Sequence, residues 1–260
     1  VIDGTANRIL SAVTAGSRPY ALCLNPQNNK VYCANYGSRS VTVIDGAIDS
    51  VIATVAVGDS PCALCYNPRG NRVYCANCGN NSLTVIDAAT DSILATVTVG
   101  SKPCALCYNS ANNRVYAANE GRDPQYDHTV SVIDGATNGV IATVTTGYGP
   151  LALCYNQQDN KVYSANYLSN SVSVIDGATS TVLANVDVGQ YPRALCYYSQ
   201  NNKIYCANIW SDSVSVIDGT SNSVLATVSV GAWPFVLCYD VHNNKVYCAN
   251  EGSNDVSVID

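Results

Sequence analysis

The tripeptide Val-Ile-Asp recurs along the whole chain and sets a fixed period. Its aspartates are Asp3, Asp45, Asp87, Asp134, Asp176, Asp218 and Asp260. Successive copies lie 42 residues apart, except that 47 residues separate Asp87 from Asp134. A period of this length is typical of repeat architectures, in which each unit buries an apolar face against its neighbours. We therefore expect one array of six units, forming a single domain over residues 1–260.

Each unit is predicted to form four short strands. The β-rich runs of one copy are residues 50–57, 63–66, 73–77 and 83–87. They are bounded by Gly, Pro, Asn and Asp, and none has a helical period, which favours strands over helices. The segment Asn67-Pro68-Arg69-Gly70-Asn71 is a turn signal, because Pro fixes φ early in a turn and Gly or Asn accepts a positive φ. One antiparallel four-stranded sheet per unit follows.

Six such sheets predict an all-β fold, a six-bladed β-propeller with sheets standing radially around an axis. A flat solenoid is the competing architecture. Residues 5–15 supply an outermost strand, whereas the last 30 residues supply only three inner strands. We expect the N-terminal outer strand to join the C-terminal three strands and close the ring. Val1-Ile2-Asp3 would then duplicate Val258-Ile259-Asp260, a surplus that this closure does not explain.

Composition excludes several classes of protein. Hydrophobic residues make up 47% and charged residues 12% of the chain, which excludes a disordered protein. The net charge of −6 argues against a nucleic-acid partner, because that affinity rests mainly on Lys and Arg. No apolar run approaches the roughly 18 residues that a membrane-spanning helix needs. Since the first residue is Val1, we expect a monomeric domain or a part of a longer, processed chain.

The second and third strands resemble a known family. The segment Val31-Tyr32-Cys33-Ala34-Asn35, with the Val-Ile-Asp-Gly strand end that follows it, resembles the YVTN β-propeller repeat. Relatives of this kind include archaeal surface-layer proteins, periplasmic propellers and accessory domains beside redox enzymes. The resemblance thus implies an extracytoplasmic location: periplasmic, secreted or at the cell surface. Many relatives have seven blades, whereas the repeat count here predicts six.

Thirteen cysteines make the chain cysteine-rich and fall into two repeated sets and three extras. The predicted innermost strands carry Cys23, Cys65, Cys107, Cys154, Cys196 and Cys238. The next strands carry Cys33, Cys75, Cys206 and Cys248. A disulfide across each hairpin is one interpretation. Ala117 and Ser164 replace the partner cysteine in two copies, which favours small buried thiols.

Two groups of residues are candidate metal ligands. Cys62, Cys78 and Cys104 are the extra cysteines, and the spacing Cys62-x-x-Cys65 resembles that of zinc ligands, although the spacing can also be accidental. The five-residue insertion brings Asp123, Asp127 and His128 beside Glu120, a set of donors suited to Ca²⁺ or a transition metal such as Zn²⁺. A solvated insertion is the alternative.

Loops at one end of the predicted ring gather aromatic side chains at the mouth of the central channel. The residues assigned to a binding site there are Tyr20, Tyr36, Tyr148, Tyr167, Tyr191, Arg193, Trp210, Trp233 and Phe235. Aromatic residues on a rigid loop face suit a protein partner or the apolar faces of sugars. The alternative is that they plug the channel.

Catalytic signals are weak. The chain has two histidines, no Gly-x-Ser-x-Gly elbow, no phosphate loop and no dinucleotide fingerprint. The repeated aspartates fit turn caps, and the repeated asparagines, such as Asn35, fit turn formers. The leading hypothesis is a non-enzymatic binding or structural propeller. The alternatives are a metal-assisted, lactonase-like hydrolase or a redox accessory domain with its site at the same mouth.

Overall fold

The computed structural model describes residues 1–121 and 127–260. Within these ranges the chain forms antiparallel sheets, five of four strands, one of three and one of two. The first sheet after the N-terminal hairpin contains β3 (Pro19–Asn25), β4 (Lys30–Asn35), β5 (Ser40–Asp45) and β6 (Ser50–Ala56). The second contains β7 (Pro61–Asn67), β8 (Arg72–Asn77), β9 (Ser82–Asp87) and β10 (Ile93–Thr98). The third contains β11 (Pro103–Asn109), β12 (Arg114–Asn119), β13 (Thr129–Asp134) and β14 (Val140–Thr145).

The remaining sheets follow the same order along the chain. The fourth contains β15 (Pro150–Asn156), β16 (Lys161–Asn166), β17 (Ser171–Asp176) and β18 (Val182–Asp187). The fifth contains β19 (Pro192–Tyr198), β20 (Lys203–Asn208), β21 (Ser213–Asp218) and β22 (Val224–Ser229), with the short 3-10 helix η1 (Ile209–Ser211) between β20 and β21. The sixth contains β23 (Pro234–Asp240), β24 (Lys245–Asn250) and β25 (Asp255–Ile259). The two-stranded sheet pairs β1 (Ile2–Asp3) with β2 (Arg8–Ile9).

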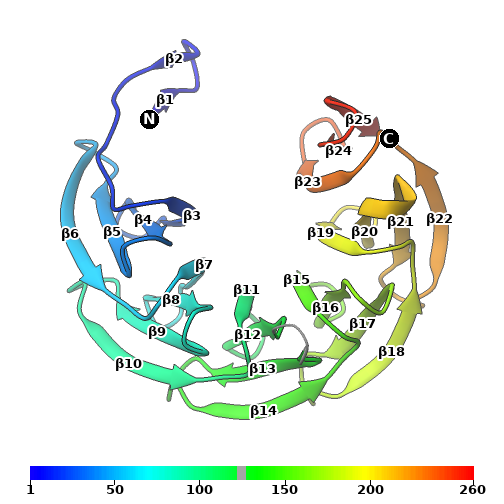
Figure 1. The fold of residues 1–260 in the computed structure, drawn as a ribbon, viewed down its shortest axis with the longest axis horizontal. Coiled ribbons are helices and arrows are strands. Elements are labelled where there is room, and N and C mark those ends of the chain that lie inside the picture. Colours follow the sequence, from blue (N-terminus) through cyan, green and yellow to red (C-terminus); the bar gives the residue numbers. More distant parts are fainter. Residues whose placement is uncertain (122–126) are drawn as a thin grey trace.

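The sheets are arranged radially around one axis (Figure 1), and we call each of the six larger sheets a blade. The first strand of each blade lies nearest the axis and the fourth lies on the outside. Both faces of an inner blade are covered by its neighbours, so the second and third strands are almost continuously apolar and buried. No helix in the described ranges has the length and apolar character needed to cross a membrane.

The apolar core lies between adjacent blades. Tyr32 of the first blade is fully buried in a cluster with Val73 and Cys75 of the second. The equivalent Tyr74 packs with Val115 and other residues of the third blade, so the same contact is repeated around the arc. Each blade therefore depends on the next one to bury its apolar face, as the period predicts.

The repeated aspartates cap the turns that follow the third strands. In one copy, Oδ1 of Asp134 accepts hydrogen bonds from the backbone N–H groups of Ala136 (2.9 Å) and Thr137 (2.7 Å). These bonds to the carboxylate lower the pKa of Asp134, with the Thr137 backbone bond contributing most. The prediction of structural turn caps is confirmed.

The repeated asparagines have a different role from the turn formation expected of them. Asn77 is fully buried at the end of β8, and its Nδ2 donates to the hydroxyls of Ser82 (3.1 Å) and Thr84 (2.9 Å) on β9. Equivalent bonds recur at Asn35, Asn166 and Asn208. These side-chain hydrogen bonds hold the second strand of a blade against the third.

Polar bonds also join adjacent blades at the turns that follow β9, β13, β17 and β21. Arg72 of the second blade donates through Nη1 to the carbonyl oxygens of Gly135 (2.7 Å) and Ala136 (2.9 Å) and to Oδ1 of Asn138 (2.9 Å), all in the turn after β13 of the third blade. We call this set of bonds the inter-blade latch. Lys30, Arg114 and Lys161 form the corresponding latches of the first, third and fourth blades.

The predicted closure of the ring is wrong in the described chain. β2 pairs only with β1, and β25 has no fourth strand beside it. Figure 1 shows an open arc, with the β1–β2 hairpin and β25 on opposite sides of the opening. The N-terminal hairpin carries its own copy of Val-Ile-Asp, the motif that ends a third strand. In the last blade this position is already taken by β25. The hairpin therefore does not fit into that blade.

The thirteen cysteines all lie within the described ranges, and no disulfide links any two of them. The register explains why the hairpin disulfides do not form. Cys23 lies opposite Tyr32, and Cys33 lies opposite Leu22, so the two cysteines are offset by one residue and point to opposite faces of the sheet. The thiols of the second strands are buried, whereas those of the innermost strands are half-buried, except for the exposed Cys238.

Candidate functional site: the axial pocket

A β-bulge at the start of each innermost strand creates the site. In the first blade, Pro19 pairs with Asn35 and Ala21 with Ala34, which leaves Tyr20 as the extra residue. Such a residue has no place in the ladder of backbone hydrogen bonds, and its side chain is re-aimed relative to the sheet. The bulged residues of the six blades are Tyr20, Cys62, Cys104, Leu151, Arg193 and Phe235.

Backbone hydrogen bonds hold the loop before each bulge against the loop that leaves the second strand. Tyr36 donates its N–H to the carbonyl oxygen of Arg18 (2.9 Å), and Glu120 donates to that of Lys102 (3.1 Å). Arg18 and Lys102 both have a φ of 52°, and the equivalent residue of every other blade also has a positive φ, between 54° and 66°. The two loops therefore form one rigid rim above each bulge.

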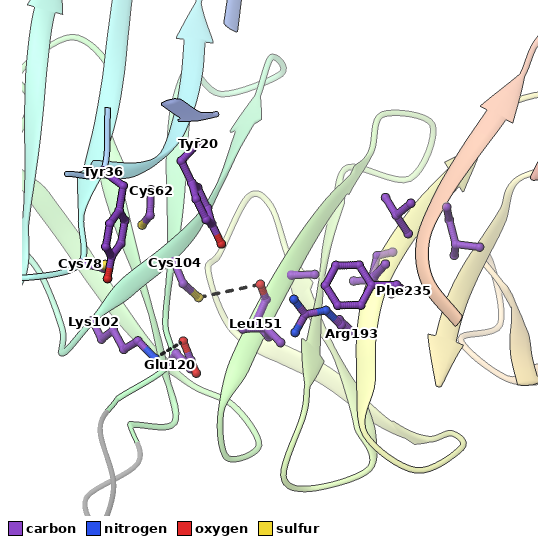
Figure 2. Close-up of a pocket in the computed structure, with 15 residues that line it drawn as sticks. Tyr20, Tyr36, Cys62, Cys78, Lys102, Cys104, Glu120, Leu151, Arg193 and Phe235 are labelled. Atoms are coloured by element: carbon purple, nitrogen blue, oxygen red, sulfur yellow. Dashed lines mark hydrogen bonds and ion pairs between the residues drawn. The ribbon is translucent and has the colours of Figure 1, made fainter. Parts of the chain in front are cut away.

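All six bulged side chains line a single cavity of about 570 Å³ on the axis. Tyr36, Cys78, Lys102 and Glu120 complete its rim, and Leu195, Val236 and Leu237 are among its apolar lining. Figure 2 shows Tyr20, Tyr36 and the thiols on one side of this axial pocket, with Arg193 and Phe235 on the other. The size falls in the usual range for small-molecule sites, roughly 300–1,000 Å³.

Two charged groups of the pocket neutralise each other. Lys102 Nζ lies 2.9 Å from Oε2 of Glu120, and both side chains belong to the third blade. Burial on its own would lower the pKa of Lys102, but the hydrogen bond and charge of Glu120 outweigh it, and the pKa is raised. Lys102 is therefore positively charged at neutral pH.

Three thiols form the wall beside this pair. Cys62 Sγ lies 3.2 Å from the carbonyl oxygen of Pro103, and Cys78 Sγ lies 3.2 Å from that of Ser60. The hydrogen bond with Cys78, followed by burial, raises the pKa of the Cys62 thiol. Burial, with the nearby charge of Glu120, raises the pKa of Cys104 to about 12. At neutral pH Cys62 and Cys104 are protonated, weakly nucleophilic thiols.

Arg193 is the one charged residue among the six bulged positions, all of which lie in the described ranges. The centre of its guanidinium lies 3.8 Å from the centroid of the Phe235 ring, which is contributed by the next blade. This cation–π contact fixes the guanidinium at the pocket wall. Figure 2 shows the two side chains stacked together and facing the cavity.

The structure separates the predicted aromatic residues into two groups. Tyr20, Tyr36, Arg193 and Phe235 line the axial pocket. The other aromatic residues assigned to the mouth are Tyr148, Tyr167, Tyr191, Trp210 and Trp233, which are not among the pocket residues. Tyr191 packs between Tyr167 (centroids 4.7 Å apart) and Trp210 (5.2 Å) on the loops of the fourth and fifth blades.

The predicted metal ligands are also placed apart. Cys62, Cys78, Cys104 and Glu120 line the pocket, whereas Asp123 lies outside the described residues. Asp127 accepts hydrogen bonds from Ser101 N (2.9 Å) and Thr129 Oγ1 (2.8 Å), and the His128 ring lies 5.1 Å from that of Tyr148. Within residues 1–121 and 127–260, no three His, Cys, Asp or Glu side chains are grouped so as to hold a metal ion.

Sequence reasoning placed Lys102 and Leu151 on the loops of this face without choosing them as site residues, and it did not consider the alanines and leucines of the inner strands. The signal was available at Leu151, because each bulged residue directly follows the repeated proline: Pro19, Pro61, Pro103, Pro150, Pro192 and Pro234. Lining residues such as Leu195 lie deeper in the strand, and their exposure to the cavity depends on strand curvature, which no local pattern encodes.

Comparison with known proteins identifies the architecture. A family model for lactonase, described as a seven-bladed β-propeller, matches residues 89–188. A chain of hydrazine synthase from Kuenenia stuttgartiensis superposes with a TM-score of 0.62 at 17% sequence identity, over 95% of this chain and 97% of that chain. The chain has a β-propeller fold. Comparison with curated proteins finds no match. At this level of identity, the likeness to hydrazine synthase concerns the propeller fold alone.

Proposed function

We propose that this propeller is a non-enzymatic binding protein whose ligand or partner occupies the axial pocket. The observation that carries the proposal is the convergence of one bulged side chain from each of the six described blades on one cavity. The repeat keeps the backbone constant there, while the six side chains differ in size, polarity and charge. Rigid scaffolding with variable residues at one end is the usual arrangement of a recognition site.

The aromatic loops outside the pocket support a wider partner surface. The side chains of Trp210 and Trp233 are 66% and 55% exposed, and Tyr191 packs against Trp210. Exposed aromatic rings held on rigid loops suit a protein or glycan partner. We therefore also propose a protein or glycan partner at these loops. We propose in addition that the protein is extracytoplasmic, as its resemblance to YVTN repeats implies.

The blade count is part of the proposal. Val1-Ile2-Asp3 and Val258-Ile259-Asp260 are both ends of third strands, and one blade has one third strand. This supports the interpretation that the β1–β2 hairpin belongs to a further blade position in the ring, in addition to the six blades described. We therefore favour a ring of seven positions over the six expected from the number of repeats, as in the seven-bladed family model that matches the central region.

Blocking the pocket tests the proposal. Leu151→Trp adds bulk at a bulged position, while Trp210→Ala removes an exposed ring from the outer loops. We expect a screen of small metabolites and a glycan array to find ligands of the wild-type protein by thermal shift and direct binding. Pocket ligands should be lost in Leu151→Trp and retained in Trp210→Ala. A protein that binds nothing in either screen, or whose ligands are unaffected by Leu151→Trp, would contradict the proposal.

A lactonase-like hydrolase is the second candidate, because the lactonase match at residues 89–188 includes Lys102, Cys104, Glu120 and Leu151 of the pocket. Glu120 is the carboxylate available there as a general base or as a metal ligand. Hydrolysis of a panel of aliphatic and sugar lactones, measured with and without added divalent cations, tests this function. Activity that is abolished in Glu120→Gln would favour the hydrolase over the binding protein.

A further inference from the structure

The Arg193 guanidinium is a cation without a protein counter-ion in the described chain. It forms no hydrogen bond or ion pair with the side chains of residues 1–121 and 127–260. Its orientation is nevertheless fixed by the Phe235 ring, 3.8 Å from the guanidinium centre. A guanidinium has five N–H donors in a planar fork, and stacking through its face leaves the edge of that fork free to donate.

The charge of Arg193 stands alone inside the pocket. Lys102 and Glu120 form an ion pair at 2.9 Å on another wall, and burial raises the pKa of the Cys104 thiol beside them to about 12. The other five bulged residues, at equivalent backbone positions, are uncharged: Tyr20, Cys62, Cys104, Leu151 and Phe235. The protein as a whole has a net charge of −6, so a local positive centre is a specific feature of this pocket.

Apolar side chains surround this cation. Leu151, Leu195, Val236 and Leu237 line the same pocket as Arg193 and Phe235, and Figure 2 shows Leu151 beside Arg193. A ligand that excludes water from this wall buries the charge, which is unfavourable unless a group of opposite charge pairs with it. A ligand that fits must therefore combine an anionic group with an apolar body.

We propose, on the basis of the binding function proposed above, that the axial pocket takes a small organic monocarboxylate, with Arg193 as the anchor of the carboxylate. Arginine and a carboxylate form two parallel N–H···O bonds of matched geometry. One unpaired positive charge balances one negative charge. A phosphate dianion would leave one negative charge without a partner in a protein that is already acidic. The apolar body of the acid lies against Leu151 and Leu237.

The experiment compares acids with their uncharged amides. The probes are acetate, phenylacetate, 3-phenylpropionate and 1-naphthylacetate, each beside the corresponding primary amide, with binding measured by calorimetry and by ligand-observed NMR. We expect at least one aromatic acid to bind about tenfold or more tightly than its amide, as for a charge-assisted bidentate pair. Acetate should bind more weakly than the larger acids, because it lacks the apolar body.

Substitutions of two arginine residues test whether the preference for acid over amide arises at Arg193. Arg193→Gln should remove the preference for acid over amide, and Arg193→Lys should restore only part of it, since Lys cannot form the bidentate pair. Arg39→Gln is the matched control: it removes the same charge from an exposed side chain that is paired with Asp59 outside the pocket. It should leave binding unchanged. Thermal melting curves confirm that each variant is folded.

Three results would overturn the proposal. If acids and amides bind equally well in the pocket, the binding function stands and the carboxylate assignment fails. If phenyl phosphate binds more tightly than phenylacetate, the site is selective for a dianion instead. If no acid and no amide of the panel binds, the carboxylate assignment fails. The wider screen with Leu151→Trp then decides whether the pocket binds any other ligand.

Discussion

The Tyr74 hydroxyl donates a 2.8 Å hydrogen bond to Oδ1 of Asn138, and this bond crosses from the second blade to the third. The same oxygen accepts a 2.9 Å bond from Arg72. A buried tyrosine thus has its body in the core between two blades and its hydroxyl in the latch that joins them. Each repeat contributes both an apolar contact and a directional bond to its neighbour.

Removing this hydroxyl should destabilise the protein measurably. We expect Tyr74→Phe to lower the free energy of unfolding by about 1 kcal/mol, the usual net value of a buried hydrogen bond. Tyr247→Phe is the matched control, because Tyr247 occupies the equivalent position in the last blade and its hydroxyl has no partner within the described residues. Urea unfolding should show a change within about 0.5 kcal/mol for this variant. Equal losses in both variants would refute the role of the latch.

Trp233 tests the backbone geometry of the pocket rim. Its φ is 55°, a conformation that residues with a Cβ adopt at some cost, and Gly149 occupies the same position in the fourth blade. We expect Trp233→Gly to be more stable than Trp233→Val by about 1–2 kcal/mol, because both lose the indole but only valine retains the left-handed strain. Thermal and urea unfolding measure the difference. A valine variant as stable as the glycine variant would contradict the assigned backbone conformation.

The sequence predicted the blades well because their determinants are local. The period located every four-stranded sheet, and the proline before Tyr20 and Arg193 marked the loops that form the pocket. The number of positions in the ring was not predictable in the same way. It depends on the rotation between neighbouring blades, which is set by packing across the whole interface and not by repeat length. The surplus Val1-Ile2-Asp3 was the one local sign that the expected closure was wrong.

The pairing of residues within the pocket was also beyond sequence reasoning. Arg193 was identified as a loop residue, but its contact with Phe235 joins residues 42 positions apart on different blades. Cys62 and Cys78 were grouped as possible ligands from their spacing. The β-bulge, which decides where each side chain points, is visible only once the register of the two strands is known.

The thiols should make the protein sensitive to alkaline pH. Burial raises the pKa of Cys23 and Cys196 to about 11 and that of Cys154 to about 12, from an ordinary value of 9.0. Below pH 9 both folded and unfolded chains hold these protons. As the pH rises above 9, the unfolded chain releases them first, so the free energy of unfolding falls until the pH reaches the folded pKa values.

Urea unfolding between pH 7 and 10.5 checks this expectation. The free energy of unfolding should fall progressively above pH 9, and Cys154→Ala should show a shallower decline than the wild-type protein, because it has one such proton fewer. Stability that does not change up to pH 10.5 would show that these thiols are not buried as described.

The cysteines should differ widely in reactivity. Cys238 is exposed on the last blade, whereas Cys75 and Cys206 are fully buried. Brief treatment with iodoacetamide at pH 8 should modify Cys238 well before the other two, as measured by peptide mass spectrometry. In urea without a reductant, all thirteen cysteines should react, because none of them forms a disulfide. A cysteine that reacts in urea only after reduction would reveal a disulfide.

The first and last blades flank the opening of the arc, and each exposes a surface that a neighbouring blade covers elsewhere in the arc. Val256 on β25 is 58% exposed, whereas the equivalent Val41 on β5 is fully buried, and Leu22 on β3 is 70% exposed. Beside these surfaces, Lys245 holds the position of a latch donor and Asn7 that of a latch acceptor. One side of the opening thus carries the donor position of an inter-blade latch, and the other side carries the acceptor position. Any additional unit built on the same repeat would find its anchoring groups already in position on both sides.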